Sequence, residues 1–168
     1  SGTFTPDEFA PNATYTPSAS EKTSGQSILT FTTTGNGACN FVSDNVTYTF
    51  TPVTTSDAGP DQTVCADITS INLAGNVTIA SGGIWKSSGS GTFSPSLNDL
   101  NAKYTPSASD KSTGSVTLTL TTTGNGTCNA VSNDMIITIT PAPVVNAGVD
   151  QTVCADVTGV VLDGTFSV

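Results

Sequence analysis

The sequence predicts an all-β chain made of tandem two-sheet Greek-key sandwiches, and three observations lead to that prediction. Ser and Thr supply 51 of the 168 residues (20 Ser, 31 Thr), whereas only 10% of the residues are charged. Short runs alternate apolar and hydroxyl side chains with a period of two, as half-buried antiparallel strands do. Turn residues separate these runs, and no window carries the apolar stripe of an amphipathic helix. About seven short strands per repeat of the sequence are typical of such a sandwich.

The second half of the chain repeats the first half at an offset of 89 residues. Residues 1–79 align with residues 90–168 without a gap, and 42 of the 79 aligned positions are identical. Pro cannot donate to a strand ladder, so the Pro-containing stretches 52–60 and 141–148 mark the edges of the repeat. We expect the chain to be a window on a longer tandem array. The predicted segments are the C-terminal part of one repeat (1–57), a complete repeat (58–146) and the N-terminal part of the next (147–168).

Strands follow one another along the complete repeat. The first alternating run contains Ile71 and Leu73, and another begins at Ile84 after two glycines. The longest runs are residues 116–121 and 135–140. The apolar positions of these runs predict the core, which consists of Val64, Leu73, Trp85, Phe93, Tyr104, Val116, Leu118, Leu120, Ile137 and Ile139. In the first segment the matching core positions are Phe4, Tyr15, Leu29, Phe31, Tyr48 and Phe50.

The charged residues exclude several classes of function. The net charge is −9, the four basic residues are all Lys, and there is no His. A nucleic-acid-binding protein neutralises phosphates with Lys and Arg, so we expect no nucleic-acid partner. Without His the chain cannot form a Ser-His-Asp triad or a His-ligated zinc site. No apolar run approaches the ~20 residues that cross a bilayer, and we expect neither enzymatic activity nor a bound cofactor.

The four cysteines recur with the repeat, since Cys39 is equivalent to Cys128 and Cys65 to Cys154. This recurrence predicts structural disulfides in an oxidising compartment, whereas the wide spacing does not suit a zinc site. The pairing stays open. Cys65 could bond Cys128 within the repeat, although the predicted topology places these two at opposite ends. A bond could instead cross a repeat junction, or Cys39 could pair with Cys65 and Cys128 with Cys154.

Acidic residues gather around the two linkers and are weak candidates for calcium ligands. Calcium takes six to eight oxygen ligands, often from carboxylates. The competing interpretation is that these residues cap turns and keep a weakly charged surface soluble. The candidates are Asp57, Asp61 and Asp67 at one linker, and Asp150 and Asp156 at the next.

Two sets of motifs resemble known repeats. The chain resembles PKD-type Ig-like domains in Ala58–Val64, Leu73–Gly75, Trp85 and Val116–Leu120. A second set resembles the tandem repeats of SprB-type gliding-motility surface adhesins of Bacteroidota, which the type IX secretion system exports. That set consists of Thr63–Asp67, Gly91–Pro95, Tyr104–Ala108 and Thr121–Cys128.

The resemblance implies an extracellular, cell-surface location and an adhesive, structural role in a large repetitive filament that serves gliding motility. The implied partners are neighbouring repeats of the same chain, a surface polysaccharide or abiotic surface, and the secretion and motility machinery. Two further functions stay open. One is a passive Ig-like spacer in a secreted, polysaccharide-active enzyme, and the second is a carbohydrate-binding module.

Overall fold

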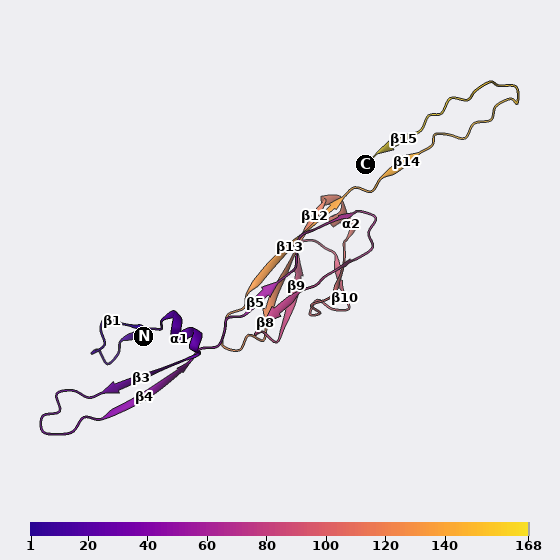
Figure 1. Cartoon of the computed structure of the whole chain (residues 1–168). Coiled ribbons are helices and arrows are strands. Elements are labelled where there is room, and N and C mark those ends of the chain that lie inside the picture. Colours follow the sequence, from indigo (N-terminus) through magenta and orange to yellow (C-terminus); the bar gives the residue numbers. More distant parts are fainter. Residues whose placement is uncertain (168) are drawn as a thin grey trace. The chain divides into compact units, whose positions relative to one another are not determined.

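The computed structural model describes residues 1–167 and divides the chain into two compact units (Figure 1). Unit one is Ser1–Thr54, and unit two begins at Thr55. Strands account for 41% of the residues and helices for 7%, which confirms the all-β prediction. Val168, the last residue of the predicted third segment, lies outside the described residues.

Unit one contains two hairpin-like pairs of strands and a short helix. Strand β1 (Thr3–Thr5) pairs antiparallel with β2 (Thr14–Thr16). Helix α1 (Ala19–Ser24) follows, and β3 (Gln26–Thr32) then pairs antiparallel with β4 (Ser43–Thr49).

Unit two contains a four-stranded sheet in the order β6-β13-β12-β9. Strand β13 (Ser132–Thr140) is central, antiparallel to β12 (Ser115–Thr123) and parallel to β6 (Gln62–Cys65). Strand β9 (Gly82–Ser87) pairs antiparallel with the far side of β12.

A second sheet of unit two has the order β10-β11-β7. Strand β11 (Lys103–Thr105) lies between β10 (Thr92–Ser94) and β7 (Ile71–Asn72), and both neighbours are antiparallel to it. Helix α2 (Ala108–Thr113) connects β11 to β12, so the chain changes sheets at this helix.

Two short ladders complete unit two. Strand β5 (Thr55–Asp57) pairs with β8 (Asn76–Thr78), and β14 (Val144–Asn146) pairs with β15 (Thr165–Ser167). Strands β14 and β15 begin and end 89 residues after β5 and β8, respectively. Likewise β1, β2 and α1 lie 89 residues before β10, β11 and α2.

The inward faces of the two sheets share one core in the described part of unit two. Alternate residues of β12 and β13 are buried, as the period of two predicts. Of the ten predicted core residues, eight are buried, and Val64 and Phe93 are half-buried against them. The core also contains Ala58, Ile71, Ala102 and Met135, which the prediction omitted.

The predicted core residues of unit one are less buried than those of unit two. Phe4 is 37% exposed, Phe31 57% and Tyr48 48%, whereas Tyr15, Leu29 and Phe50 are half-buried. In unit two, β6 and β9 flank β13 and β12 in one sheet and β7 flanks β11 in the other, and the described residues 1–54 contain no counterpart of these three strands. The two-stranded pairs of unit one therefore leave these side chains partly exposed.

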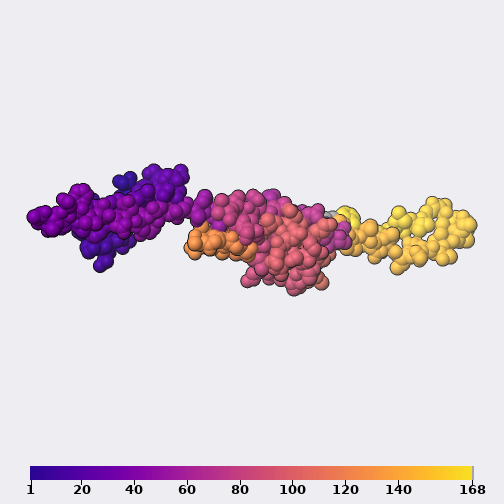
Figure 2. Space-filling view, turned by 90° about the horizontal axis from the view of Figure 1, so that it is seen from below, coloured from indigo at the N-terminus to yellow at the C-terminus, as the bar shows by residue number. Residues whose placement is uncertain are grey.

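The predicted segments and the two compact units have different bounds. Thr55–Asp57 forms β5, pairs with β8 and is grouped with unit two. Residues from 147 onward are also grouped with unit two. The space-filling view shows this part, in yellow, as a single layer of chain with open space between its two arms (Figure 2). A hairpin of this kind has no second layer on which to build a core.

The two helices are absent from the fold that the sequence predicts. Each has six residues, which is too few to display an apolar stripe. Each begins at a capping box, Ser18 with Glu21 and Ser107 with Asp110, and ends at a glycine with positive φ. These local hydrogen bonds satisfy some of the terminal amides and carbonyls that so short a helix would otherwise leave without partners.

The chain enters and leaves the complete repeat at opposite ends of β13. Near the start of unit two, the Ser56 hydroxyl donates to the Leu120 carbonyl (2.8 Å), and the Ala58 amide donates to Asn133 Oδ1 (2.8 Å). Asn133 is the second residue of β13, and the strand ends at Thr140. At about 3.3 Å per residue the two positions are about 23 Å apart, so the repeat adds at least this length to the chain.

Candidate functional site

In the described part of unit two, the carboxylate that accepts the most hydrogen bonds is the buried Asp110, on helix α2. Its Oδ2 accepts hydrogen bonds from the Tyr104 hydroxyl (2.7 Å) and the Ser107 amide (2.9 Å), and its Oδ1 accepts one from the Ser90 amide (3.1 Å). Asp110 is 3% exposed and Tyr104 is fully buried. We call Tyr104, Ser107, Asp110 and Ser90 the polar clasp, because they tie α2 to β11 and to the turn before β10.

Electrostatics favour the ionised form of Asp110. Burial by itself raises the pKa of this carboxyl, but the hydrogen bonds from Ser107, Tyr104 and Ser90 outweigh burial, and the pKa is lowered overall. The pKa of Tyr104 is raised, chiefly by burial; the neighbouring Asp110 also raises it, whereas the hydrogen bond with Ser87 lowers it. The clasp is therefore a carboxylate held by neutral donors.

Unit one contains the same clasp with Glu in place of Asp. Glu21 Oε1 accepts from the Tyr15 hydroxyl (2.6 Å), and Oε2 accepts from the Ser18 amide (2.8 Å). These bonds, with Tyr15 the largest contributor and Ser18 next, lower the pKa of Glu21 from 4.5 to about 2. The Ser27 hydroxyl donates to the same carboxylate at 3.2 Å. The clasp thus recurs with the sequence repeat.

A glycine is required beside each clasp. A Cβ atom at Gly91 would lie 2.5 Å from the Thr105 carbonyl oxygen and from Cζ of Tyr104, and a Cβ at Gly2 would overlap the corresponding backbone. Because no side chain fits between the two strands at this point, the tyrosine hydroxyl can reach the backbone on the far side. In unit one the Gly2 amide donates to that hydroxyl at 3.0 Å.

The clasp fixes structure and does not present reactive groups. Both oxygens of Asp110 accept hydrogen bonds from the protein, and the Tyr104 hydroxyl is already in contact with Ser87 and Asp110. The sequence pattern places Tyr104 in the core but does not identify Asp110 as its partner. The signal that would have found it is the recurrence of Tyr-x2-Ser-x2-Asp/Glu, which combines a capping box with a tyrosine.

The structure does not bring the calcium candidates together. Asp57 Oδ1 accepts from the Gly59 amide, close to the Asn133 end of β13, whereas Asp61 Oδ1 accepts from the Ile136 amide. Asp67 follows Ala66, whose amide bonds the carbonyl of Thr140 at the other end of that strand.

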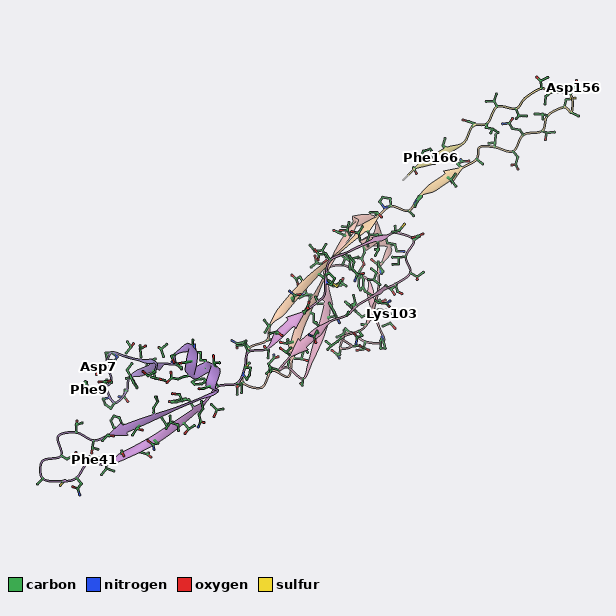
Figure 3. The ribbon with its side chains drawn as sticks, in the orientation of Figure 1. Asp7, Phe9, Phe41, Lys103, Asp156 and Phe166 are labelled. Atoms are coloured by element: carbon green, nitrogen blue, oxygen red, sulfur yellow. The ribbon has the colours of Figure 1, made fainter. Side chains whose placement is uncertain are left out.

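The remaining candidates, Asp150 and Asp156, are exposed, and Figure 3 shows Asp156 at the tip of the C-terminal hairpin. No group of three or more potential metal ligands occurs among the described residues. Asp57 and Asp61 cap turns and amides, in keeping with the turn-capping interpretation of these acidic residues.

No two cysteines lie at disulfide-bond distance in the part of the chain that the structure describes. Cys65 ends β6 beside Thr140, whereas Cys128 lies in the turn before β13, where its amide donates to the Asn125 carbonyl at 3.0 Å. The nine residues of β13 separate them, about 27 Å at strand spacing. A disulfide needs Cα atoms within about 7 Å, so this geometry is incompatible with a bond within the repeat.

The outer surface of unit two carries hydroxyl groups, and its tryptophan is buried. Thr117, Thr119 and Thr121 lie half-buried in a row along β12, and the Thr121 hydroxyl bonds that of Ser132 (2.8 Å). Trp85 is 2% exposed, so it cannot serve as a platform on which a sugar ring stacks. This removes the residue that would most readily support a carbohydrate-binding module.

Comparisons with protein-family models and with curated protein sequences find no match for the chain. Within residues 1–167, no helix has the length and apolar character needed to cross a membrane.

Proposed function

We propose that this chain is a structural and adhesive segment of a large, repetitive, extracellular filament that attaches cells to surfaces and, by its resemblance to SprB-type repeats, serves gliding motility. The observation that carries the proposal is the path of the chain through unit two, which enters near Asn133 and leaves at Thr140. Repeats connected in this way follow one another end to end, so each repeat adds its length to the filament. Repetition then gives reach, which is the property that a surface filament needs.

Strand order supports an Ig-like Greek-key sandwich for each repeat. The order β7-β11-β10 in one sheet and β9-β12-β13 in the other corresponds to strands B-E-D and C-F-G of Ig domains. The chain passes from one sheet to the other between β9 and β10, and returns between β11 and β12. Elements that lie 89 residues apart begin and end at equivalent positions of the repeat, which supports a tandem arrangement of such domains.

The pairing of β6 with β13 suits a protein under tension. These strands are parallel, with four pairs of residues from Gln62 with Ile137 to Cys65 with Thr140. Pulling the two ends of the repeat apart loads the two strands in opposite directions along their length. All the backbone hydrogen bonds between them then resist together, whereas a hairpin pulled open would lose them one after another.

Adhesion would arise from many weak contacts. The chain has Ser and Thr at 51 positions, whereas only 10% of its residues are charged, so its surface offers mainly hydroxyl groups to a polysaccharide or an abiotic surface. Weak contacts repeated along a filament give avidity without a high-affinity pocket. The partners proposed are therefore surfaces with hydroxyl groups, together with neighbouring repeats of the same chain.

Beads that carry the chain at graded density test the adhesive role. Under laminar flow over polysaccharide-coated glass and over bare glass, we expect retention to rise more steeply than linearly with the number of chains per bead. Beads that carry the chain with unit two unfolded by Asp110→Lys serve as the control for non-specific sticking. Equal loss of both bead types at every density would contradict adhesion and would favour the passive spacer.

A further inference from the structure

The outer side of the four-stranded sheet in unit two carries three rows of side chains, each centred on a threonine of β12. In the middle row, Thr119 pairs with Lys86 of β9 on one side and with Asp134 of β13 on the other. Residues that pair directly across strands point to the same face of a sheet, and Lys86 and Asp134 are both exposed. The middle row therefore has a positive charge on one side of a small hydroxyl group and a negative charge on the other.

The next row combines a large apolar side chain with a small polar one. Thr121 pairs with Ile84 of β9 and with Ser132 of β13. Ile84 is 38% exposed, and the hydroxyl groups of Thr121 and Ser132 bond each other at 2.8 Å. The large side chain of this row thus lies on the β9 side, and the small one on the β13 side.

The third row has the same composition in the reverse order. Thr117 pairs with Ile136 of β13, which is 45% exposed. On the β9 side of Thr117 lies the small Ser88, whose hydroxyl accepts a hydrogen bond from the Thr117 amide (2.9 Å). We call the three rows together the three-row face. Its residues are Ile84, Lys86, Ser88, Thr117, Thr119, Thr121, Ser132, Asp134 and Ile136.

We propose that two copies of this chain associate side by side through the three-row face. A two-fold axis that runs along β12, between the two sheets, brings each row against the same row of the second copy in reverse order. Lys86 of each copy then faces Asp134 of the other, each isoleucine faces a serine, and each threonine faces a threonine. Such a contact is isologous, so it closes with two copies.

The two charges select this axis. An axis that crosses the strands at Thr119 would also bring the two faces together, but it would place Lys86 against Lys86 and Asp134 against Asp134. Like charges brought together in an interface are unfavourable, whereas opposite charges fix its register. Sheets packed face to face lie about 10 Å apart, a gap that a lysine and an aspartate side chain can span together. The arrangement that suits the face is therefore the axis along β12.

The contact is small, so a single pair of chains should bind weakly. The outermost positions of the face are about 10 Å apart across the strands and about 14 Å apart along them. Stable interfaces bury roughly 1,200 Å² or more, so we expect a dissociation constant of about 0.1–1 mM.

A filament of the kind proposed above would strengthen the contact by repetition. Every repeat that carries the charge pair would add one weak contact, and avidity would then hold neighbouring filaments side by side. Unit one has Asn45 at the position of Asp134, so the pair does not occur in every repeat. The association of two chains does not itself depend on the proposed function.

Sedimentation equilibrium of the full chain, over concentrations that reach the expected dissociation constant, tests the proposal. Dithiothreitol keeps thiols from linking copies, and physiological salt screens the net charge of −9 on each copy beyond about 8 Å. The mass should rise with concentration above the 16.9 kDa of one chain. Lys86→Glu and Asp134→Lys should each weaken the association by about tenfold or more, because each creates two pairs of like charges.

A mixture of the two variants distinguishes this contact from any other association of the chain. The glutamate introduced at position 86 of one variant then faces the lysine introduced at position 134 of the other. The native Asp134 of the first variant faces the native Lys86 of the second. The mixture should therefore regain the wild-type association, and so should a chain that carries both substitutions.

The matched control is Lys103→Glu, which makes the same change of charge on the other sheet. Lys103 is an exposed residue of β11 (Figure 3), so this variant should associate like the wild type. Lys86 and Asp134 are exposed, so their variants should keep the fold of unit two, which Trp85 fluorescence checks. A mass of one chain at every concentration, an association that Lys86→Glu leaves unchanged, or a mixture that does not regain the association would each overturn the proposal.

Discussion

In the described part of unit two, Asp110 is the side chain that accepts the most hydrogen bonds. One carboxylate receives donors from β11, from the start of α2 and from the turn before β10, so three successive segments between Ser90 and Asp110 depend on a single charge. A buried charge with all its hydrogen bonds made is stable, but removal of the charge leaves the donors without an acceptor of equal strength.

Asp110→Asn should destabilise unit two by roughly 2–4 kcal/mol at pH 7, because at least one buried donor then faces an amide N–H₂. The pKa of Asp110 is lower in the folded state than its ordinary value of 3.8. Its contribution is therefore present above pH 4 and is lost as the pH falls through the folded-state pKa. The wild type should lose stability below pH 4 more steeply than the variant.

Urea unfolding followed by tryptophan fluorescence measures this effect in unit two alone, because Trp85 is the single tryptophan of the chain. Asp67→Asn is the matched control, since Asp67 is exposed. It should shift the free energy of unfolding by less than about 0.5 kcal/mol. Equal stability of wild type and Asp110→Asn at pH 7 would disprove a stabilising clasp.

Trp85, in contrast to Asp110, is held by apolar packing although its polar group makes no hydrogen bond within the described residues. Its indole Nε1 is buried, and within the described residues it has no hydrogen-bond partner. An unmade buried hydrogen bond costs roughly 1–3 kcal/mol. The ring packs near Phe93, with 6.5 Å between centroids, and lies within the core cluster, so apolar burial offsets that cost.

The turn between β12 and β13 explains why Thr-Thr-Thr-Gly-Asn-Gly occurs twice. The middle threonine closes both turns: Oγ1 of the buried Thr122 accepts from the Val131 amide at 2.9 Å, and Oγ1 of the exposed Thr33 accepts from the Val42 amide at 3.0 Å. Gly124 and Gly126 have φ of +66° and +60°, which glycine adopts without steric cost. The hydroxyl closes the base of the turn and the glycines reverse the chain.

Thr122→Val should destabilise unit two by about 1–2 kcal/mol, because it keeps the shape of the side chain but leaves the Val131 amide without its acceptor. The midpoint of urea unfolding, read from Trp85 fluorescence, should fall without a change in slope. The neighbouring Thr121→Val is the control. The Thr121 hydroxyl bonds Ser132 at the surface, so its loss should matter less.

In unit two as a whole, mechanical resistance and thermodynamic stability depend on different strands. The long antiparallel pair β12 and β13 supplies half of the buried core residues. The short parallel pair β6 and β13 lies on the path of the load between the two ends of the repeat. A change in β6 that leaves the core intact should therefore weaken the repeat under force more than in denaturant.

Ala66→Pro, directly after β6, should lower the mean unfolding force of unit two by roughly half, because the Ala66 amide donates to the Thr140 carbonyl (2.8 Å) and proline removes that donor. Ala66 carries only a methyl group, so the core keeps its large side chains. Single-molecule stretching of the chain, tethered at both ends, gives the force. Thr92→Pro in β10, outside the load path, is the control, and an equal drop in force for both variants would refute this load path.

Much of the fold follows from local pattern. Alternation along residues 116–121 and 135–140 correctly predicts which side chains of β12 and β13 are buried, because side chains alternate across a strand whatever its neighbours are. The helices escaped prediction because six residues show no periodicity, although their capping boxes were visible at Ser18 and Ser107. Met135 follows the same alternation as Ile137 and Ile139, whereas Ala102 precedes β11 outside any strand and is buried by tertiary packing.

The amino-acid sequence alone determined the strand-rich character of this protein, its 89-residue recurrence and the alternation that separates core from surface, because composition and period act within a few residues. Only the tertiary structure decided which strands meet. It spread Asp57, Asp61 and Asp67 along β13, placed Cys65 and Cys128 at opposite ends of that strand, and joined Tyr104 to Asp110. Such placements depend on the pairing of segments far apart in the chain, which no local pattern encodes.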